Sequence, residues 1–159
     1  MSTRVGIIVL SGTLDKVMPA FMLGTTAAAM GMEVGMFFSF YGINVLHKDK
    51  LKELKVSPVG NPAIPMPFPV PQFFTILPGM VDLTTSMMKK MMKENKVPDI
   101  EQLLNQAKDL GVKLFPCNTA LQLFGYKKED LIEGTEKPVG ASTFLNFVAA
   151  AEKPIVMNF

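Results

Sequence analysis

The chain has little of the side-chain chemistry on which most enzymes rely. Its 159 residues include one cysteine, one histidine and no tryptophan. A lone cysteine excludes an internal disulfide, and with it the small disulfide-stapled folds of secreted proteins. The single histidine, His47, cannot form a metal site alone, and its place in the run Leu46-His47-Lys48 favours a surface or helix-end position. Cys117 is therefore the first candidate for covalent chemistry.

Charge is also scarce. Only 19% of the residues are charged, the net charge is +2, and the basic residues are scattered along the chain. Nucleic-acid binding would need a basic patch, so we exclude it. No GxGxxG or GxxxxGK[ST] motif is present, so we expect no nucleotide or other cofactor. The thirteen methionines are soft potential ligands for copper(I), but Met30, Met32 and Met36 fall in expected core elements, and we expect no bound metal.

The length and the first residues favour one cytoplasmic domain. With 159 residues, of which 48% are hydrophobic, the chain can build one sizeable core but not two ordinary domains. Residues 1–4 lead directly into the apolar run 5–10 without a signal-peptide cleavage pattern. Together with the single cysteine, this pattern predicts a reduced, cytoplasmic location.

One long apolar segment resembles a membrane span. Between residues 17 and 46 the only charged residue is Glu33, and about 18 apolar residues are enough to suggest a transmembrane helix. Glu33 lies near the middle, where a carboxylate costs roughly 2.5 to 3.5 kcal/mol on insertion scales. A buried βαβ unit is equally apolar, and we favour that interpretation.

Hydrophobic patterns alternate between strands and helices along the chain. Strands are expected at residues 5–10, 33–40, 112–116, 136–139 and 154–159. Helices are expected at residues 14–30, 47–55, 80–95, 98–110, 119–124, 129–133 and 143–151. The alternation predicts an α/β fold, namely a three-layer α/β/α sandwich with a mostly parallel five-stranded sheet.

Residues 56–96 form an insertion rich in proline and methionine. Seven prolines between residues 58 and 78 exclude a regular helix and a central strand there. The apolar loop 64–77 is compatible with a membrane-dipping segment, an oligomer interface or a lid over Cys117, and we favour an interface or a lid. The helix expected at 80–95 is amphipathic, with paired methionines facing one way and lysines largely the other.

Small polar residues and glycines recur where the expected strands end. Ligands of open parallel sheets gather beyond the carboxyl ends of the strands. Helices follow several of these ends, and their N–H groups favour a bound anion or an ionised thiol. Free cysteine is also often a buried small hydrophobe, so position alone leaves both roles open for Cys117. The other candidates for binding substrate or an anion are Ser11, Gly12, Thr13, Tyr41, Asn118, Thr119, Gly140 and Ser142.

Five stretches spread over most of the chain form a distinctive series. They are IIVLSGTLDK (7–16), AAAMGMEV (27–34), LGVKL (110–114), GYKKEDLI (125–132) and VGAS (139–142). In this order and spacing they resemble the DsrE-like family of small sulfur-handling proteins. The resemblance implies a DsrE/F/H-like fold, homo-oligomeric assembly, and a cysteine after the third main strand that carries sulfur as a persulfide or thiosulfonate. Only Cys117 matches that position.

Two features depart from the compact family pattern. The insertion at 56–96 resembles a longer subgroup, some members of which associate with membranes, so peripheral membrane contact is compatible with the chain but not favoured. Some relatives also have a second cysteine, which this chain lacks. Any sulfur on Cys117 must therefore leave to another protein or to a small thiol.

The resemblance implies a cysteine-based sulfur carrier or sulfurtransferase. The Cys117 thiolate would attack the sulfane sulfur of thiosulfate, of tetrathionate or of a partner's persulfide. Backbone N–H groups of Asn118 and Thr119, with hydroxyls from Ser11, Thr13 or Ser142, are expected to stabilise the anionic tail. The alternative is a non-catalytic interaction module that uses the apolar insertion to contact oligomer partners, other proteins or a membrane surface. The sequence does not distinguish a protein that only carries sulfur from an enzyme that turns over.

Overall fold

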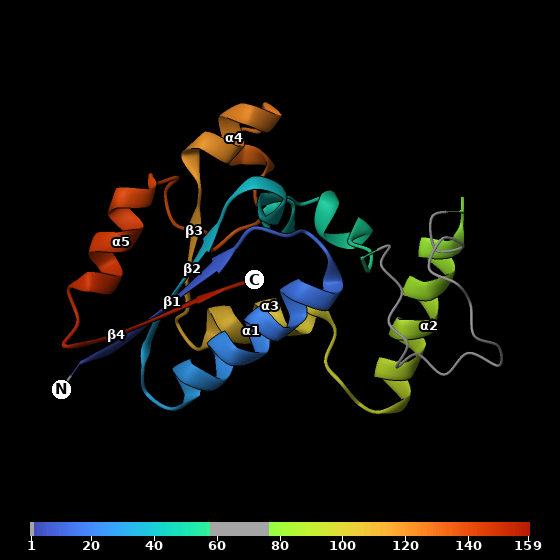
Figure 1. The fold of residues 1–159 in the computed structure, drawn as a ribbon, viewed down its shortest axis with the longest axis horizontal. Coiled ribbons are helices and arrows are strands. Elements are labelled where there is room, and N and C mark those ends of the chain that lie inside the picture. Colours follow the sequence, from blue (N-terminus) through green and yellow to red (C-terminus); the bar gives the residue numbers. More distant parts are fainter. Residues whose placement is uncertain (1, 58–76) are drawn as a thin grey trace.

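Four parallel strands form the centre of the fold in a computed structural model that describes residues 2–57 and 77–159 (Figure 1). The strands are β1 (Thr3–Val9), β2 (Glu33–Phe38), β3 (Lys113–Pro116) and β4 (Lys153–Asn158). Their order is β3-β2-β1-β4, and every neighbouring pair is parallel. The proline-rich stretch and most of the apolar loop at 64–77 lie outside the described residues.

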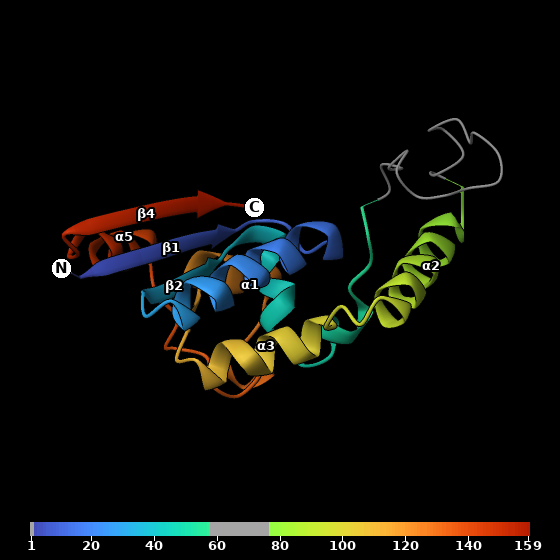
Figure 2. The ribbon, with the colours of Figure 1, turned by 90° about the horizontal axis from the view of Figure 1, so that it is seen from below.

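Helices cover both faces of this sheet, which confirms the three-layer arrangement. On one face α1 (Leu14–Ala29) packs against the sheet and against α3 (Ile100–Asp109), and on the other lies α5 (Ala141–Ala149) (Figure 2). The α5 helix approaches closely because Gly6 and Gly35 lack side chains on that face. A Cβ atom at Gly35 would lie 2.5 Å from Cε1 of Phe147.

The sheet has four strands, so the predicted five-stranded sheet is wrong. Residues 136–139 form only an isolated parallel bridge, between Val139 and Cys117. Glu136 and Val139 both donate their N–H groups to carbonyls of β3. In a regular parallel strand the residues that donate to one neighbour are two apart, whereas these two are three apart. Pro138, which has no N–H group, lies between them, so the ladder cannot continue.

Five of the expected helices are confirmed to within two residues. They are α1, α2 (Met80–Glu94), α3, α4 (Asn118–Phe124) and α5. Asp99 begins α3 with a capping box, in which its side chain accepts from the Gln102 N–H group and the Gln102 side chain accepts from the Asp99 N–H group. This cap explains why α3 starts where the sequence predicts.

Two shorter predictions hold only in part. The helix expected at 47–55 is reduced to a 3-10 helix, Lys50–Glu53, and that at 129–133 to a 3-10 turn, Lys128–Asp130. Backbone groups in these segments bond to other parts of the chain instead, as when Lys48 donates to the Asp130 carbonyl. The segment after β2, for which the sequence predicted no helix, forms another 3-10 helix, Phe40–Leu46.

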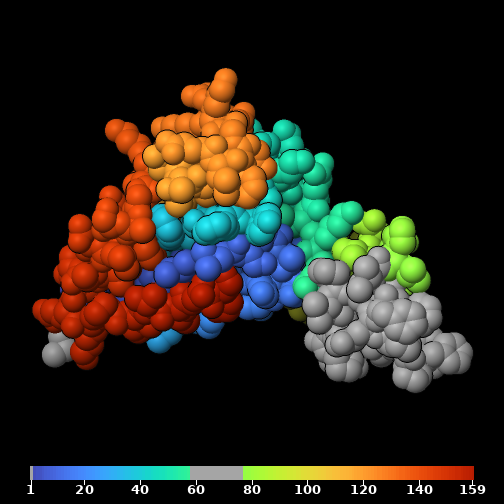
Figure 3. Space-filling model, turned by 45° about the horizontal axis from the view of Figure 1, so that its top comes forward, coloured from blue at the N-terminus to red at the C-terminus, as the bar shows by residue number. Residues whose placement is uncertain are grey.

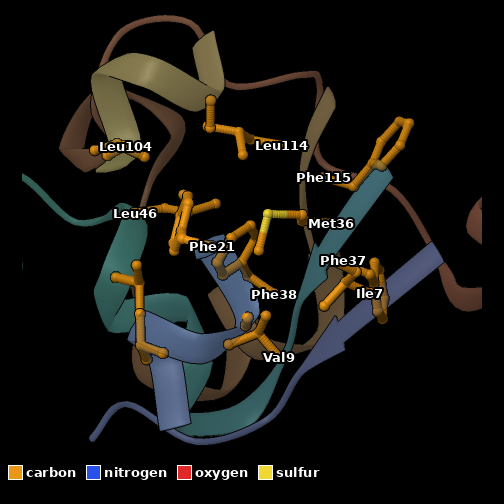
Figure 4. Packing of buried hydrophobic residues seen from close by; sticks show 14 of the residues in the cluster. Ile7, Val9, Phe21, Met36, Phe37, Phe38, Leu46, Leu104, Leu114 and Phe115 are labelled. Carbon is orange, nitrogen blue, oxygen red and sulfur yellow. The ribbon is translucent and has the colours of Figure 1, made fainter. Parts of the chain in front are cut away.

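The hydrophobic core lies on both faces of the sheet, and a large part of it is between the sheet and the layer of α1 and α3. Figure 4 shows the buried side chains of Phe21, Met36 and Phe38 gathered between β2 and α1. The rings of Phe21 and Phe38 are 5.9 Å apart. Burying each such side chain is worth about 1.5 to 3 kcal/mol, and the packing fixes β1 and β2, whose ends carry the candidate site.

The α2 helix stands away from the rest of the domain (Figure 2). Its Thr85 hydroxyl accepts a hydrogen bond from the Val56 N–H group at 3.1 Å, and its Asp82 pairs with Lys55 at 2.6 Å. Met88 and Met92 pack against the edge of the core. In the part of the chain that the structure describes, no helix is both long and apolar enough to cross a membrane.

Candidate functional site

The carboxyl ends of the strands are joined by hydrogen bonds just beyond the regular sheet. Ser39 donates its N–H to the Val9 carbonyl at 3.0 Å, and Cys117 donates its N–H to the Phe38 carbonyl at 2.9 Å. These bonds place the residues that follow β1, β2 and β3 side by side at one edge. The carboxyl ends of these three strands therefore lie together, as predicted from the sequence.

Cys117 lies at the junction between β3 and α4. It is a free cysteine and is 6% exposed. Its backbone is extended, with φ −74° and ψ 121°, and its carbonyl accepts the Leu121 N–H at 3.1 Å in the first turn of α4. The backbone of Cys117 is therefore held on both sides, and the residue is largely buried.

The first turn of α4 differs from our expectation at Asn118. Its N–H group donates to the Val139 carbonyl at 3.0 Å, so it is not free to hold an anion. The cause is the bridge between Cys117 and Val139, which brings that carbonyl beside α4. The Thr119 N–H, by contrast, is an exposed first-turn donor without an acceptor among the described residues.

The loops after β1 and β2 touch each other. Ser11 Oγ and Thr13 Oγ1 are 3.0 Å apart, and Ser11 Oγ also accepts the Thr13 N–H at 3.3 Å. A Cβ atom at Gly12 would lie 2.6 Å from the carbonyl oxygen of Tyr41. The structure therefore brings Ser11, Gly12 and Thr13 together with Tyr41, and only glycine fits at the contact.

A row of rings connects the β2 loop to α4, and sequence reasoning missed it. The Tyr41 ring lies 5.8 Å from that of Phe124, which in turn lies 5.7 Å from Tyr126. His47 packs on Tyr126 at 4.6 Å, and the Tyr126 hydroxyl donates to Asn44 Oδ1 at 2.9 Å. Figure 3 shows α4 and the segment after β2 side by side at this end of the molecule. The aromatic pair at 124 and 126 was the only local signal.

Phe40 is another feature of the site that was not predicted from the sequence. Its φ is 45°, in the left-handed region that a bulky side chain rarely adopts. Phe40 is 58% exposed and Tyr41 is 64% exposed, so burial of the rings does not offset the backbone strain. Strain of this kind is concentrated at functional sites, and here it lies one residue beyond the Ser39 bond to β1.

Gly140 and Ser142 lie at the start of α5. Gly140 precedes the helix, and its carbonyl accepts the Thr143 N–H at 3.2 Å. Val139 forms a parallel bridge with Cys117, and Gly140 is the next residue along the chain. No hydrogen bond joins Ser142 to Cys117 within the described ranges. The structure thus forms one group around Cys117 and Gly140 and another around Ser11 and Tyr41, with the ring row connecting α4 to the second.

The site offers no place for a metal among the residues described. No group of three or more histidine, cysteine, aspartate or glutamate side chains is arranged to hold an ion in residues 2–57 and 77–159. His47 ends the 3-10 helix Phe40–Leu46, and its Nδ1 accepts the Asp49 N–H at 3.2 Å. The described residues instead bring together a thiol at the start of α4, with the Gly140 backbone near it, and separately the hydroxyls of Ser11 and Thr13.

Two solved structures share the fold. The protein YchN from E. coli has a TM-score of 0.56 at 13% identity, with complete coverage of both chains. The protein MTH1491 of Methanobacterium thermoautotrophicum, described as of unknown function, has a TM-score of 0.56 at 12% identity and covers 99% of this chain and 100% of its own. At such low identity these similarities establish the architecture alone.

Sequence comparison identifies closer relatives. The sulfur carrier protein DsrE2 of Allochromatium vinosum is 39% identical over 153 residues, which is 94% of each chain. The uncharacterized protein YrkE of Bacillus subtilis is 30% identical over 141 residues, or 82% of each. The model of the DsrE/DsrF/DrsH-like family matches residues 1–156. The chain belongs to the DsrE/DsrF/DrsH-like family.

Proposed function

We propose that the chain is a sulfur carrier that holds sulfane sulfur on Cys117 and passes it to a partner protein or a small thiol. The observation that carries the proposal is the position of the chain's only cysteine, a free thiol between the end of β3 and the start of α4. The name of the DsrE2 relative, a sulfur carrier protein, supports the same role.

The chemistry is a displacement at sulfur. The Cys117 thiolate attacks the sulfane sulfur of thiosulfate, a new S–S bond forms, and the S–S bond of thiosulfate breaks to release sulfite. With tetrathionate the product is a thiosulfonate and thiosulfate leaves. With a partner's persulfide the leaving group is the partner's thiolate. An acceptor thiolate then takes the outer sulfur and restores the Cys117 thiolate.

The surroundings of Cys117 suit such a carrier. The start of α4 offers the positive end of a helix and the Thr119 N–H, which has no acceptor among the described residues; both favour the anionic outer sulfur or sulfonate. The thiol is largely buried, which limits its oxidation, since oxidation of a cysteine follows its exposure. The chain has no second cysteine, so the sulfur must be passed to another molecule.

Assembly and location are further parts of the proposal. We expect a homo-oligomer, since the edge strand β4 leaves Ile155 and Val156 42% and 53% exposed, and such edges tend to be covered. We also expect a single cytoplasmic domain spanning residues 1–159, with an insertion at 56–96 like that of a longer subgroup of the family. Light scattering on the eluted peak of a sizing column measures the assembly, and a monomer would contradict it.

Intact-protein mass spectrometry tests the carrier role. The reduced protein is incubated with thiosulfate, tetrathionate or polysulfide and weighed before and after treatment with a reductant. We expect a reducible gain of sulfur on the native chain and none on Cys117→Ser. Circular dichroism shows whether the variant is folded. An unchanged mass of the native chain with all three donors would refute the proposal.

The interaction-module alternative makes the opposite prediction. If the insertion alone is the working surface, deletion of residues 58–76 abolishes partner or membrane association and Cys117→Ser does not. If the carrier proposal holds, the deletion variant still gains sulfur on Cys117. The two variants measured side by side therefore distinguish the two functions.

A further inference from the structure

A cavity of about 1170 Å³ lies between α2 and the body of the domain. Its apolar lining comes from the start of α1, the 3-10 helix Lys50–Glu53, the end of α2 and the start of α3. The residues are Leu14, Met18, Leu51, Met92, Val97 and Ile100. None of the candidate residues around Cys117 lines this space, so it is a separate site.

Four lysines surround the apolar lining. Lys89 and Lys93 come from α2, Lys96 from the turn after it, and Lys52 from the opposite wall. In the ranges that the structure covers, none of the four forms an ion pair or a side-chain hydrogen bond, whereas the neighbouring Lys90 pairs with Glu94. None of these four ammonium groups is therefore directly paired with a carboxylate among the described residues.

Two acidic residues also line the cavity, so that against the four lysines they leave two positive charges in excess. The Asp99 carboxylate accepts the Gln102 N–H and so caps α3, and Glu101 is exposed in the first turn of that helix. Lys89 and Lys93 are four residues apart on α2, a spacing at which like charges destabilise a helix. A bound anion would remove that repulsion.

The turn that positions Lys96 is strained. Lys96 has a φ of 55°, at a place after a helix where glycine is the usual residue. The next residue, Val97, donates to the Met92 carbonyl at 2.9 Å, which folds the turn back onto α2. The chain thus has a lysine in a strained conformation in the cavity wall, where glycine would remove the strain.

We propose that this cavity binds a single-chain anionic amphiphile, a carboxylate with an alkyl tail. The tail lies on the apolar lining and the head lies among the lysines. An inorganic anion would leave the half-buried side chains of Met92 and Val97 exposed to water, and a neutral apolar molecule would leave the lysines without a counter-charge. Met18 and Met92 adapt easily to the shape of a tail, because methionine side chains are flexible.

Isothermal titration calorimetry of the full chain with decanoate tests the proposal. Acetate has the same head without the tail, and decyltrimethylammonium has the same tail with the opposite charge. We expect saturable one-to-one binding of decanoate, none of acetate, and at least about tenfold weaker binding of the cation, a difference of about 1.4 kcal/mol.

Variants of the lysines provide the second measurement. The double substitution Lys89→Gln with Lys93→Gln is expected to raise the decanoate dissociation constant about fivefold, the effect of removing two exposed charge contacts. Lys90→Gln changes the charge of the same helix outside the cavity and is expected to leave it unchanged. Circular dichroism checks that α2 is intact in each variant.

Four outcomes would overturn the proposal. Equal binding of decanoate and decyltrimethylammonium would show that the lysines take no part, as would unchanged binding by the folded double variant. Binding to phosphatidylglycerol vesicles without saturable binding of decanoate would identify the surface as a membrane contact. A change of oligomeric state in the double variant without any decanoate binding would identify it as an interface between copies of the chain.

Discussion

Lys113 donates a hydrogen bond to the carboxylate of Glu33 at 2.7 Å, which joins β3 to β2 at the amino ends of the strands. The other oxygen of Glu33 accepts from Arg4 Nε at 2.5 Å, so β1 is held as well. Arg4 also donates to the Phe147 carbonyl at 2.6 Å, and both cations lie over the Phe147 ring. The hydrogen bond from Lys113, followed by that from Arg4, lowers the pKa of Glu33. One carboxylate thus connects three strands and α5, at the end of the sheet opposite Cys117.

Glu33→Gln is expected to lower the free energy of unfolding by about 1 kcal/mol, the upper end for exposed ion pairs, because two cations lose their partner. The side chain is 38% exposed, so water screens part of the interaction. Urea denaturation at neutral pH measures the change. Glu53→Gln removes the exposed pair with Lys50 and is expected to have no measurable effect. Equal effects of the two substitutions would contradict the connecting role of Glu33.

The contribution of Glu33 is expected to depend on pH. Because folding lowers its pKa from the ordinary 4.5, the folded state favours the ionised form. The stabilisation is complete above the unfolded value and is lost as the pH falls through the folded one. The stability difference between the native chain and Glu33→Gln should therefore be constant near neutral pH and disappear in acid. Urea midpoints measured across this range test it, and a difference that grows in acid would have the wrong sign.

The sequence predicted correctly those helices and strands that are determined by the pattern of their own residues. The apolar runs predicted β1 and β2, and the helical pattern at 98–110 predicted α3. The strand at 136–139 was predicted wrongly because a single proline, Pro138, interrupts an otherwise suitable run. The effect of Pro138 depends on which N–H groups of this segment face β3. The sequence does not show this, because it depends on how the segment packs beside β3 in the folded protein.

The candidate site was predictable only in outline. The carboxyl ends of parallel strands must lie at one edge, so the strand order predicts that Ser11, Tyr41 and Cys117 lie at the same end of the sheet, but not that they form two separate groups there. The use of the Asn118 N–H by Val139 could not be predicted, since it depends on a bridge between segments with no regular pairing. The contact of Tyr41 with α4 is likewise tertiary, because its partner Phe124 lies far along the chain.

Phe40→Gly is expected to stabilise the folded protein by about 0.5 to 1 kcal/mol, because glycine adopts a positive φ without strain. The exposed ring contributes little burial to offset this gain. The neighbouring substitution Tyr41→Gly is the matched control, and it should destabilise the protein because the ring contacts Phe124. Thermal unfolding followed by circular dichroism compares the two. A loss of stability in Phe40→Gly would mean that the ring makes contacts that outweigh its backbone strain.

Gly12→Ala tests whether the two loops of the candidate site control access to Cys117. The new methyl group would lie 2.6 Å from the Tyr41 carbonyl oxygen, and a backbone atom cannot move away as a flexible side chain can. We expect a loss of about 1 to 3 kcal/mol of stability, as for other overpacked contacts. Displacing Tyr41 also disturbs its contact with α4, so alkylation of Cys117 by iodoacetamide should become faster. At Gly140 a Cβ atom would meet nothing nearer than 3.9 Å, so Gly140→Ala should change neither quantity. Faster alkylation in both variants would indicate general loosening, whereas an unchanged rate in a destabilised Gly12→Ala would separate the loop contact from access to the thiol.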